Sequence, residues 1–319
     1  MDAPGIVYAL VTVMAWGSWL VPSQGVRFPD EQAKTFYVAL ASLLIVIPVV
    51  FARGEFGQLA GIAAWVPVLG GLIWAASAYC AFVGCRHIGI AKAFGIWAPL
   101  NIVVSFIWGL TLFGQFRDSS LPIGLLAAQS VLLVIIGILM IIFAGDPGVR
   151  DAAGTGKSAR LGVSGACAAG VLWGTYYIPS AYLSRGMRGA SEVSPWASAL
   201  PLSVGMMIGT SVLVALTGRG PRLDKGRDYV RAIASGALWT AGNFGMLLTV
   251  KAIGPGPGYT IASLCVVVNA LWGIFYFKDP APRSRAALWI ILGVILATLA
   301  GLVLGNLGAL EGMYQITPR

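Results

Sequence analysis

Ten blocks of about 20 mostly apolar residues follow one another along this chain, and the charged residues are almost confined to the segments between them. Charged residues make up 10% of the sequence and hydrophobic residues 58%. Soluble domains typically contain about 25% charged and about 45–50% apolar residues. A chain so poor in charge cannot cover a water-exposed surface. Because each block is long enough for a helix to cross a bilayer, the sequence predicts an all-α integral membrane protein.

The predicted transmembrane helices cover residues 5–23, 35–52, 62–85, 90–113, 121–144, 161–183, 196–217, 230–251, 256–277 and 285–307. A β-barrel is excluded because the blocks do not alternate between apolar and polar residues. We expect residues 1–145 to form a first five-helix repeat, residues 146–160 a cytoplasmic linker, and residues 161–319 a second five-helix repeat.

A recurring motif predicts that the two halves are related. The pattern W-G-[ST]-[WY]-x-[VI]-P-S occurs at residues 16–23 and again, without a gap, at residues 173–180. Three shorter matches follow in the same order in both halves, and one of them pairs Trp108-Gly109 with Trp272-Gly273. Since five is odd, the second copy is expected to lie inverted in the membrane, as in many secondary transporters that work by alternating access. Pro22 and Pro179, at equivalent points, are either hinges or plain helix ends.

Loop charge predicts the orientation. Fifteen of the 21 Lys and Arg residues follow the first, third, fifth, seventh and ninth predicted helices. The positive-inside rule therefore places both termini outside and the linker in the cytoplasm, and we expect a bacterial cytoplasmic membrane. The same rule accounts for the net charge of +9 without a nucleic-acid partner. The four cysteines lack metal-ligand spacing and are interpreted as packing residues.

Short motifs resemble those of the drug/metabolite transporter superfamily, and within it most closely the glucose/ribose porters and the rhamnose–proton symporters. The motifs are G-A-L-W-x-x-G-N at residues 236–243, Ile253-Gly254, Trp272-Gly273-Ile274 and the closing L-G-N-L at residues 304–307, with Trp74, Ile88-Gly89-Ile90 and Phe113-Gly114 in the first half. The resemblance implies a ten-helix transporter of small neutral polar metabolites, most closely a monosaccharide. An exporter of drugs or amino acids on the same fold is the alternative.

Aromatic and amide side chains share single faces of several predicted helices. Trp16, Trp19 and Ser23 are spaced i, i+3 and i+7, and Trp97 and Asn101 are spaced i and i+4. Aromatic rings can stack on the C–H faces of a sugar, and amides can bond its hydroxyls. The same residues can also serve as interhelical packing. The candidate substrate-binding residues are Trp16, Trp19, Trp74, Trp97, Asn101, Trp173, Tyr176, Trp239, Asn243 and Asn269.

Two basic residues are candidates for gating. Lys92 lies at the start of a predicted helix and either extends to the interface or reaches the mouth of a cavity. His87, the only histidine, is either solvated or a proton-sensitive gate.

No acidic residue falls inside the ten predicted helices. This argues against a cation exporter, which needs an intramembrane carboxylate, and leaves proton coupling as a possibility only through other groups. A membrane enzyme is not expected either, because catalysis needs a cluster of acid, base or nucleophile inside the helices. We predict no catalytic residue, metal or cofactor. The G-x-x-x-G pairs Gly205/Gly209 and Gly301/Gly305 are interpreted as contacts within the chain or as a face for a homodimer.

Overall fold

The computed structural model describes residues 3–114, 119–144, 156–179, 193–253 and 261–316, and within these ranges every regular element is helical. The longer helices are α1 (Ala3–Ser18), α2 (Glu31–Ala52), α3 (Pro67–Ile88), α4 (Ile90–Thr111), α5 (Leu121–Ile142), α6 (Gly156–Trp173), α8 (Pro195–Thr217), α9 (Gly226–Ile253) and α12 (Arg285–Gly305). The shorter elements are η1 (Phe56–Leu59), η2 (Ile62–Trp65), α11 (Cys265–Leu271), the π-helical η3 (Trp272–Tyr276) and α13 (Leu307–Ile316).

Length and composition qualify six of the described helices as membrane spans: α2, α3 together with η2, α4, α5, α8 and α12. Their outer surfaces are apolar. On α5, Leu125, Leu132 and Leu139 recur every seven residues and are 63%, 57% and 44% exposed. An apolar face that no other helix covers suits contact with lipid. The predicted all-α membrane architecture is thus confirmed.

Local chemistry explains where several helices begin. Asp30 caps α2 by accepting a hydrogen bond from the amide of Ala33 (2.8 Å), and Ser284 caps α12 by accepting one from Ala287 (3.0 Å). These caps satisfy backbone donors that have no partner inside the helix. The α3 helix ends at Gly89, whose φ of 75° favours glycine.

Several predicted boundaries are wrong. The α1 helix ends at Ser18 rather than at residue 23, because the chain tightens into a turn in which the amide of Val21 bonds the carbonyl of Ser18 (2.9 Å). Pro22 therefore lies beyond the end of α1. The α6 helix begins at Gly156, inside the predicted linker, and ends at Trp173; residues 145–155 and 180–192 lie outside the described ranges. In the block at 256–277, the described helix begins at Cys265 and changes to π-helix at Trp272.

The placement of acidic residues also needs correction. Glu31 is the first residue of α2, and Asp228, which is 9% exposed, lies in the first turn of α9. Both helices begin four residues before their predicted starts, so these carboxylates belong to helix ends. Glu311 lies in α13, an element that the hydropathy pattern did not predict because ten residues are too short to span a bilayer.

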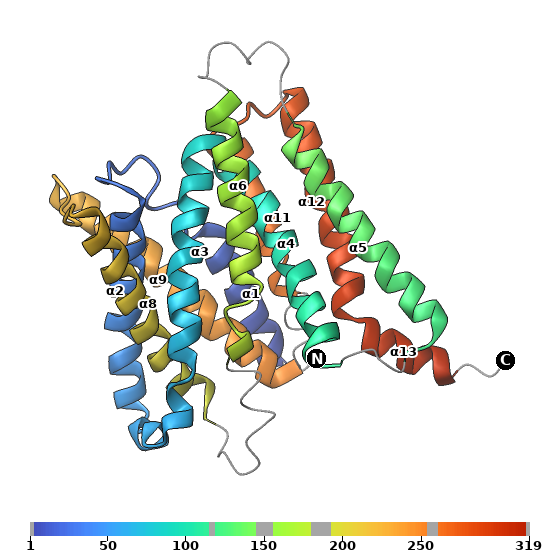
Figure 1. Cartoon of the computed structure of the whole chain (residues 1–319), viewed down its shortest axis with the longest axis horizontal. Coiled ribbons are helices and arrows are strands. Elements are labelled where there is room, and N and C mark those ends of the chain that lie inside the picture. Colours follow the sequence, from blue (N-terminus) through green and yellow to red (C-terminus); the bar gives the residue numbers. More distant parts are fainter. Residues whose placement is uncertain (1–2, 115–118, 145–155, 180–192, 254–260, 317–319) are drawn as a thin grey trace.

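The helices form a bundle whose two sides differ (Figure 1). The α2, α8 and α9 helices lie on one side and α5 and α12 on the other, with α1, α3, α4 and α6 between them. The α13 helix lies across the end of the bundle at which α5 begins. There the carboxylate of Glu311 accepts hydrogen bonds from the amide (3.2 Å) and the hydroxyl (3.2 Å) of Ser120, the residue that precedes α5.

Glycines allow the helices to touch backbone to backbone. A Cβ at Gly71 of α3 would lie 2.2 Å from the carbonyl oxygen of Leu202 on α8. On α8, a Cβ at Gly205 would lie 2.1 Å from the carbonyl oxygen of Val68, so this glycine packs within the chain. Gly209 and Gly301 likewise face Ala75 and Ile102 of the same chain. The interpretation of the G-x-x-x-G glycines as packing contacts within the chain is confirmed for Gly205, Gly209 and Gly301.

We predict that Gly71→Ala lowers the free energy of unfolding by about 1–3 kcal/mol, because the new methyl group overpacks a contact with rigid backbone. Gly124→Ala is the matched control, since it also lies in a helix but its Cβ would meet no atom within 4 Å. Thermal unfolding of the purified protein in detergent measures both. Equal midpoints for Gly71→Ala and Gly124→Ala would contradict the packing described here.

Candidate functional site

Tryptophan rings from three regions of the chain meet inside the bundle. The ring centroid of Trp173, at the end of α6, lies 5.3 Å from that of Trp97 on α4 and 6.3 Å from that of Trp19, just after α1. Trp19 also packs on Phe82 of α3 at 5.5 Å. Trp19 and Trp97 are each 3% exposed. Aromatic pairs at these distances stabilise a fold by more than the apolar area that they bury.

A second pair of rings joins α3 to α9. The centroids of Trp74 and Trp239 are 4.8 Å apart in an edge-to-face arrangement, with exposures of 0% and 4%. The indole N–H of Trp16 donates a hydrogen bond to the carbonyl of Trp239 (3.2 Å). The indole nitrogen of Trp74 is buried without a hydrogen-bond partner among the described residues. A buried donor of this kind costs free energy unless a ligand or water satisfies it.

Tyrosines complete the site. Tyr176, 6% exposed, packs its ring 4.0 Å from that of Tyr177. The hydroxyl of Tyr177 donates a hydrogen bond to Oδ1 of Asn243 (2.8 Å), which is 3% exposed. All these rings belong to one buried apolar cluster of the bundle. We call the following residues the aromatic cluster: Trp16, Trp19, Trp74, Trp97, Trp173, Tyr176, Tyr177 and Trp239.

The other two predicted amides lie in helix contacts beside the aromatic cluster. Asn101 accepts a hydrogen bond from the hydroxyl of Ser105 (3.2 Å) on its own helix. Asn269 is fully buried, and its Nδ2 donates to the carbonyl of Gly17 (3.3 Å) while its Oδ1 has no partner among the described residues. The structure therefore brings Asn243 to the rings, joins the Asn101 side chain to its own helix, and places Asn269 at a contact with Gly17 of α1.

Contacts at equivalent positions of the two halves match. The indole N–H of Trp272 donates to the hydroxyl of Ser18 (2.9 Å), and that of Trp108 donates to the hydroxyl of Thr175 (3.0 Å). These four residues belong to the recurring motifs.

The contacts of the neighbouring glycines, Gly17 and Gly174, also match between the two halves. The carbonyl of Gly17 accepts from Asn269 (3.3 Å), and that of Gly174 accepts from Ser105 (3.2 Å). A Cβ at Gly17 would lie 2.4 Å from the Cβ of Val268, and one at Gly174 would lie 2.6 Å from the Cβ of Val104.

The two basic candidates lie away from the rings, at one end of the bundle. Lys92 Nζ donates a hydrogen bond to the carbonyl of Ala144 (3.0 Å), which follows α5. The Nδ1 atom of His87 lies 2.8 Å from the hydroxyl of Ser158 in the first turns of α6, and the side chain is half-buried. Each therefore links two neighbouring segments at this end, and neither contacts the aromatic cluster directly.

Sequence reasoning missed Tyr177 and Lys34. Tyr177 lies four residues after Trp173, the spacing of a single helix face, and this signal could have identified it, although α6 ends at Trp173 and residues 174–177 form turns. Lys34 lies just before the predicted helix at 35–52, yet in the structure it is 9% exposed on α2, with its ammonium 4.4 Å from the ring centroid of Phe82. The prediction that Trp16, Trp19 and Ser23 share one helix face is wrong, because Trp19 and Ser23 follow the end of α1.

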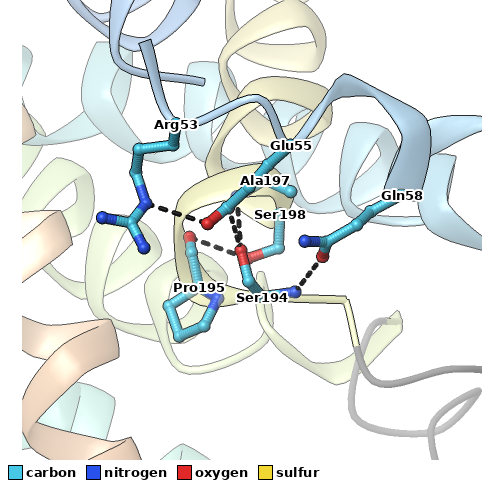
Figure 2. Close-up of polar contacts among 7 residues, drawn as sticks. All are labelled: Arg53, Glu55, Gln58, Ser194, Pro195, Ala197 and Ser198. Atoms are coloured by element: carbon cyan, nitrogen blue, oxygen red, sulfur yellow. Dashed lines mark hydrogen bonds and ion pairs between the residues drawn. The ribbon is translucent and has the colours of Figure 1, made fainter. Parts of the chain in front are cut away.

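A polar cluster joins the end of α2 to the start of α8 (Figure 2). The carboxylate of Glu55 pairs with Nε of Arg53 (2.8 Å) and accepts a hydrogen bond from the hydroxyl of Ser194. Ser194 also caps α8 through the amide of Ala197 (3.1 Å), and its own amide donates to Oε1 of Gln58 (2.8 Å). We call Arg53, Glu55, Gln58 and Ser194 the α2–α8 clasp. It closes the end of the bundle opposite to Glu31, the first residue of α2.

The fold and the buried site define a multi-pass membrane protein with an aromatic and amide centre. The family model described as "Sugar transport protein" matches residues 7–307. The chain therefore belongs to this family of sugar transporters.

Individual relatives agree over nearly the full length. The glucose uptake protein GlcU of Bacillus subtilis is 23% identical over 307 residues, covering 94% of this chain and 97% of that one. A solved crystal structure, described only as that of a protein, superposes with a TM-score of 0.58 over 99% of this chain and all of the other. Its sequence identity is 15%, so this likeness shows the fold alone.

The α2–α8 clasp makes stability depend on pH. Burial alone would raise the pKa of Glu55, but hydrogen bonds from Ser194 and Arg53 and the charge of Arg53 outweigh it and hold the pKa below its ordinary value of 4.5. The carboxylate therefore contributes stability above pH 4.5, and this contribution is lost as the pH falls through the lowered pKa.

We expect the thermal unfolding midpoint of the wild type to fall more between pH 7 and pH 3 than that of Glu55→Gln, in which this group no longer titrates. Asp224→Asn, at an exposed position, serves as the control and should behave like the wild type. If Glu55→Gln showed the full wild-type drop, the carboxylate would not stabilise the clasp.

Proposed function

We propose that this protein carries a monosaccharide across the membrane by alternating access around the aromatic cluster. The observation that carries the proposal is the meeting of buried rings from α3, α4, α9 and the ends of α1 and α6 next to the amide of Asn243. Ten predicted site residues lie in or beside this centre, and membership of the sugar transport family supports the substrate class. Relatives named as glucose uptake proteins make glucose the first sugar to test.

The chemistry of the centre suits a neutral polyol. A sugar offers apolar C–H faces that stack on indole and phenol rings, and hydroxyls that both donate and accept. The buried indole N–H of Trp74 and Oδ1 of Asn269 are a donor and an acceptor without partners among the described residues. In the structure the rings contact one another, so sugar binding requires that neighbouring helices separate them.

The matched contacts support ten transmembrane helices arranged as two inverted repeats, the arrangement of the drug/metabolite transporter superfamily. Under that relation α1 corresponds to α6, α3 to α9, and α4 to α11, and the packing pairs exchange accordingly. The α3–α6 contact corresponds to α9–α1, and α4–α6 corresponds to α11–α1. The α2–α8 and α5–α12 pairs each correspond to themselves, as expected for helices on a pseudo-two-fold axis.

Orientation follows from the same arrangement. The start of α1 and the end of α12 lie at one end of the bundle, and the ends of α3 and α5 lie at the other (Figure 1). With the basic loops in the cytoplasm, both termini are outside and the α2–α8 clasp closes the outer end. In this arrangement the site is shut toward the outside.

The test removes stacking and hydrogen bonding separately. We expect Trp239→Phe and Asn243→Ala each to lower the initial rate of glucose uptake into proteoliposomes by about tenfold, which corresponds to about 1.4 kcal/mol of lost binding to the transport path. Trp289→Phe is the matched control, because Trp289 lies on α12 with 38% exposure and outside the aromatic cluster. It should stay within about twofold of the wild type.

Size-exclusion profiles and unfolding midpoints of all three variants show whether each protein is folded. Folded Trp239→Phe and Asn243→Ala proteins with wild-type uptake would contradict the assignment of the site. A wild type that takes up an amino acid or a quaternary ammonium, and none of glucose, ribose or rhamnose, would contradict the sugar substrate.

A further inference from the structure

A cavity of about 480 Å³, lined by both charged and apolar side chains, lies at the end of the bundle opposite to the α2–α8 clasp. The start of α2, the last turns of α3 and the segment after α8 line it, through residues that include Asp30, Glu31, Tyr79, Arg86 and Arg219. Its volume falls within the range of about 300–1,000 Å³ found for small-molecule sites. None of the residues predicted to bind substrate lines this cavity.

The charges of the cavity balance. Two residues with carboxylates, Asp30 and Glu31, and two with guanidinium groups, Arg86 and Arg219, line it. Glu31 and Arg86 form an ion pair of 3.0 Å across the gap between α2 and α3. A site with one dominant sign of charge selects ions, whereas balanced donors and acceptors suit a neutral ligand with many hydroxyls.

One acceptor in this lining lacks a partner. Asp30 uses Oδ1 to cap α2, and its buried Oδ2 has no hydrogen bond to any described residue. Tyr79, which is half-buried, adds an aromatic face. Because Oδ2 has almost no accessible surface in this structure, a sugar hydroxyl can bond it only after the carboxylate turns toward the cavity. A carboxylate oxygen and a ring are then the two groups that a sugar hydroxyl and its neighbouring C–H face can satisfy.

The cavity also connects to the aromatic cluster through side-chain contacts. Lys34 lies one turn after Glu31 on α2, and its ammonium lies 4.4 Å from the ring centroid of Phe82. Phe82 packs on Trp19 at 5.5 Å. Lys34 and Phe82 are 9% and 1% exposed, so this series of side-chain contacts is buried in this state.

We infer that this cavity is a second sugar site, a vestibule that holds a neutral monosaccharide between the cytoplasm and the aromatic cluster. The inference rests on the proposed function for its substrate class. It adds a site with its own residues: Asp30 accepts a sugar hydroxyl, Tyr79 stacks on the ring, and the Glu31–Arg86 pair lines the opening. Lys34 and Phe82 form the inner barrier that must move before sugar passes.

The test measures protection of an introduced thiol. Thr217 lines the cavity and is exposed, so Thr217→Cys is introduced into a variant whose four native cysteines are alanine. Modification by a charged methanethiosulfonate reagent is followed in purified protein in detergent, where both ends are accessible. The matched control is Lys225→Cys, exposed at the same end and outside the cavity lining.

We expect saturating glucose to slow modification of Thr217→Cys by about tenfold, the occupancy factor near ten times Kd, and to leave Lys225→Cys unchanged. Adding Trp239→Phe should preserve this protection, because the vestibule binds sugar without the aromatic cluster. Asp30→Asn, which keeps a helix-capping residue, should weaken it. If the cysteine-free protein does not fold, the same labelling is done with the native cysteines present and read by peptide mass.

Three results would overturn the inference. If glucose does not slow modification of Thr217→Cys in protein that transports glucose, the cavity is not a sugar site and the proposed function stands. Protection that disappears with Trp239→Phe would show that a change at the aromatic cluster, and not sugar in the cavity, shields the thiol. Protection by glucose 6-phosphate but not by glucose would assign the cavity to an anion and would also overturn it.

Discussion

Direct backbone contact at small residues determines how the helices of this protein pack. Lipid gives helices no hydrophobic reason to associate, so close approach and interhelical hydrogen bonds must hold them. Gly17 against Val268 and Gly174 against Val104 bring the ends of α1 and α6 onto α11 and α4. That approach lets Trp272 reach Ser18, and it gathers the rings of the aromatic cluster around the ends of α1 and α6. A side chain at either glycine would separate these helices and open the centre.

The two ends of the bundle differ in ways that fit one state of a transport cycle. At one end Glu55 and Ser194 join α2 to α8 directly. At the other end lies a cavity, and Lys34 and Phe82 are the residues that we propose to separate it from the rings. If the halves are inverted copies, exchanging their conformations would release the clasp and close the cavity. With the clasp released and the cavity closed, the aromatic cluster would be open to the opposite side of the membrane.

The sequence predicted the all-α membrane class because a helix that crosses a bilayer needs about 20 mostly apolar residues, and this requirement is visible along the whole of each block. It also predicted most residues of the aromatic cluster, since buried tryptophans and amides stand out in apolar blocks. Periodicity did not predict the ends of α1 and α6, where turns replace the helix at Trp19 and Tyr177. Periodicity also missed Lys34, because the sequence alone does not distinguish a lysine in the first turn of a helix from a lysine in the preceding loop. The partner that buries it, Phe82, comes from another helix.

The most direct test of alternating access at this site is counterflow. Proteoliposomes containing the purified protein are loaded with unlabelled glucose and diluted into a trace of labelled glucose. A carrier with one alternating site exchanges the two, so labelled glucose should accumulate transiently above its external concentration without any ion gradient. A monotonic approach to equilibrium, with no overshoot, in vesicles that take up glucose would contradict the account and indicate a channel-like path.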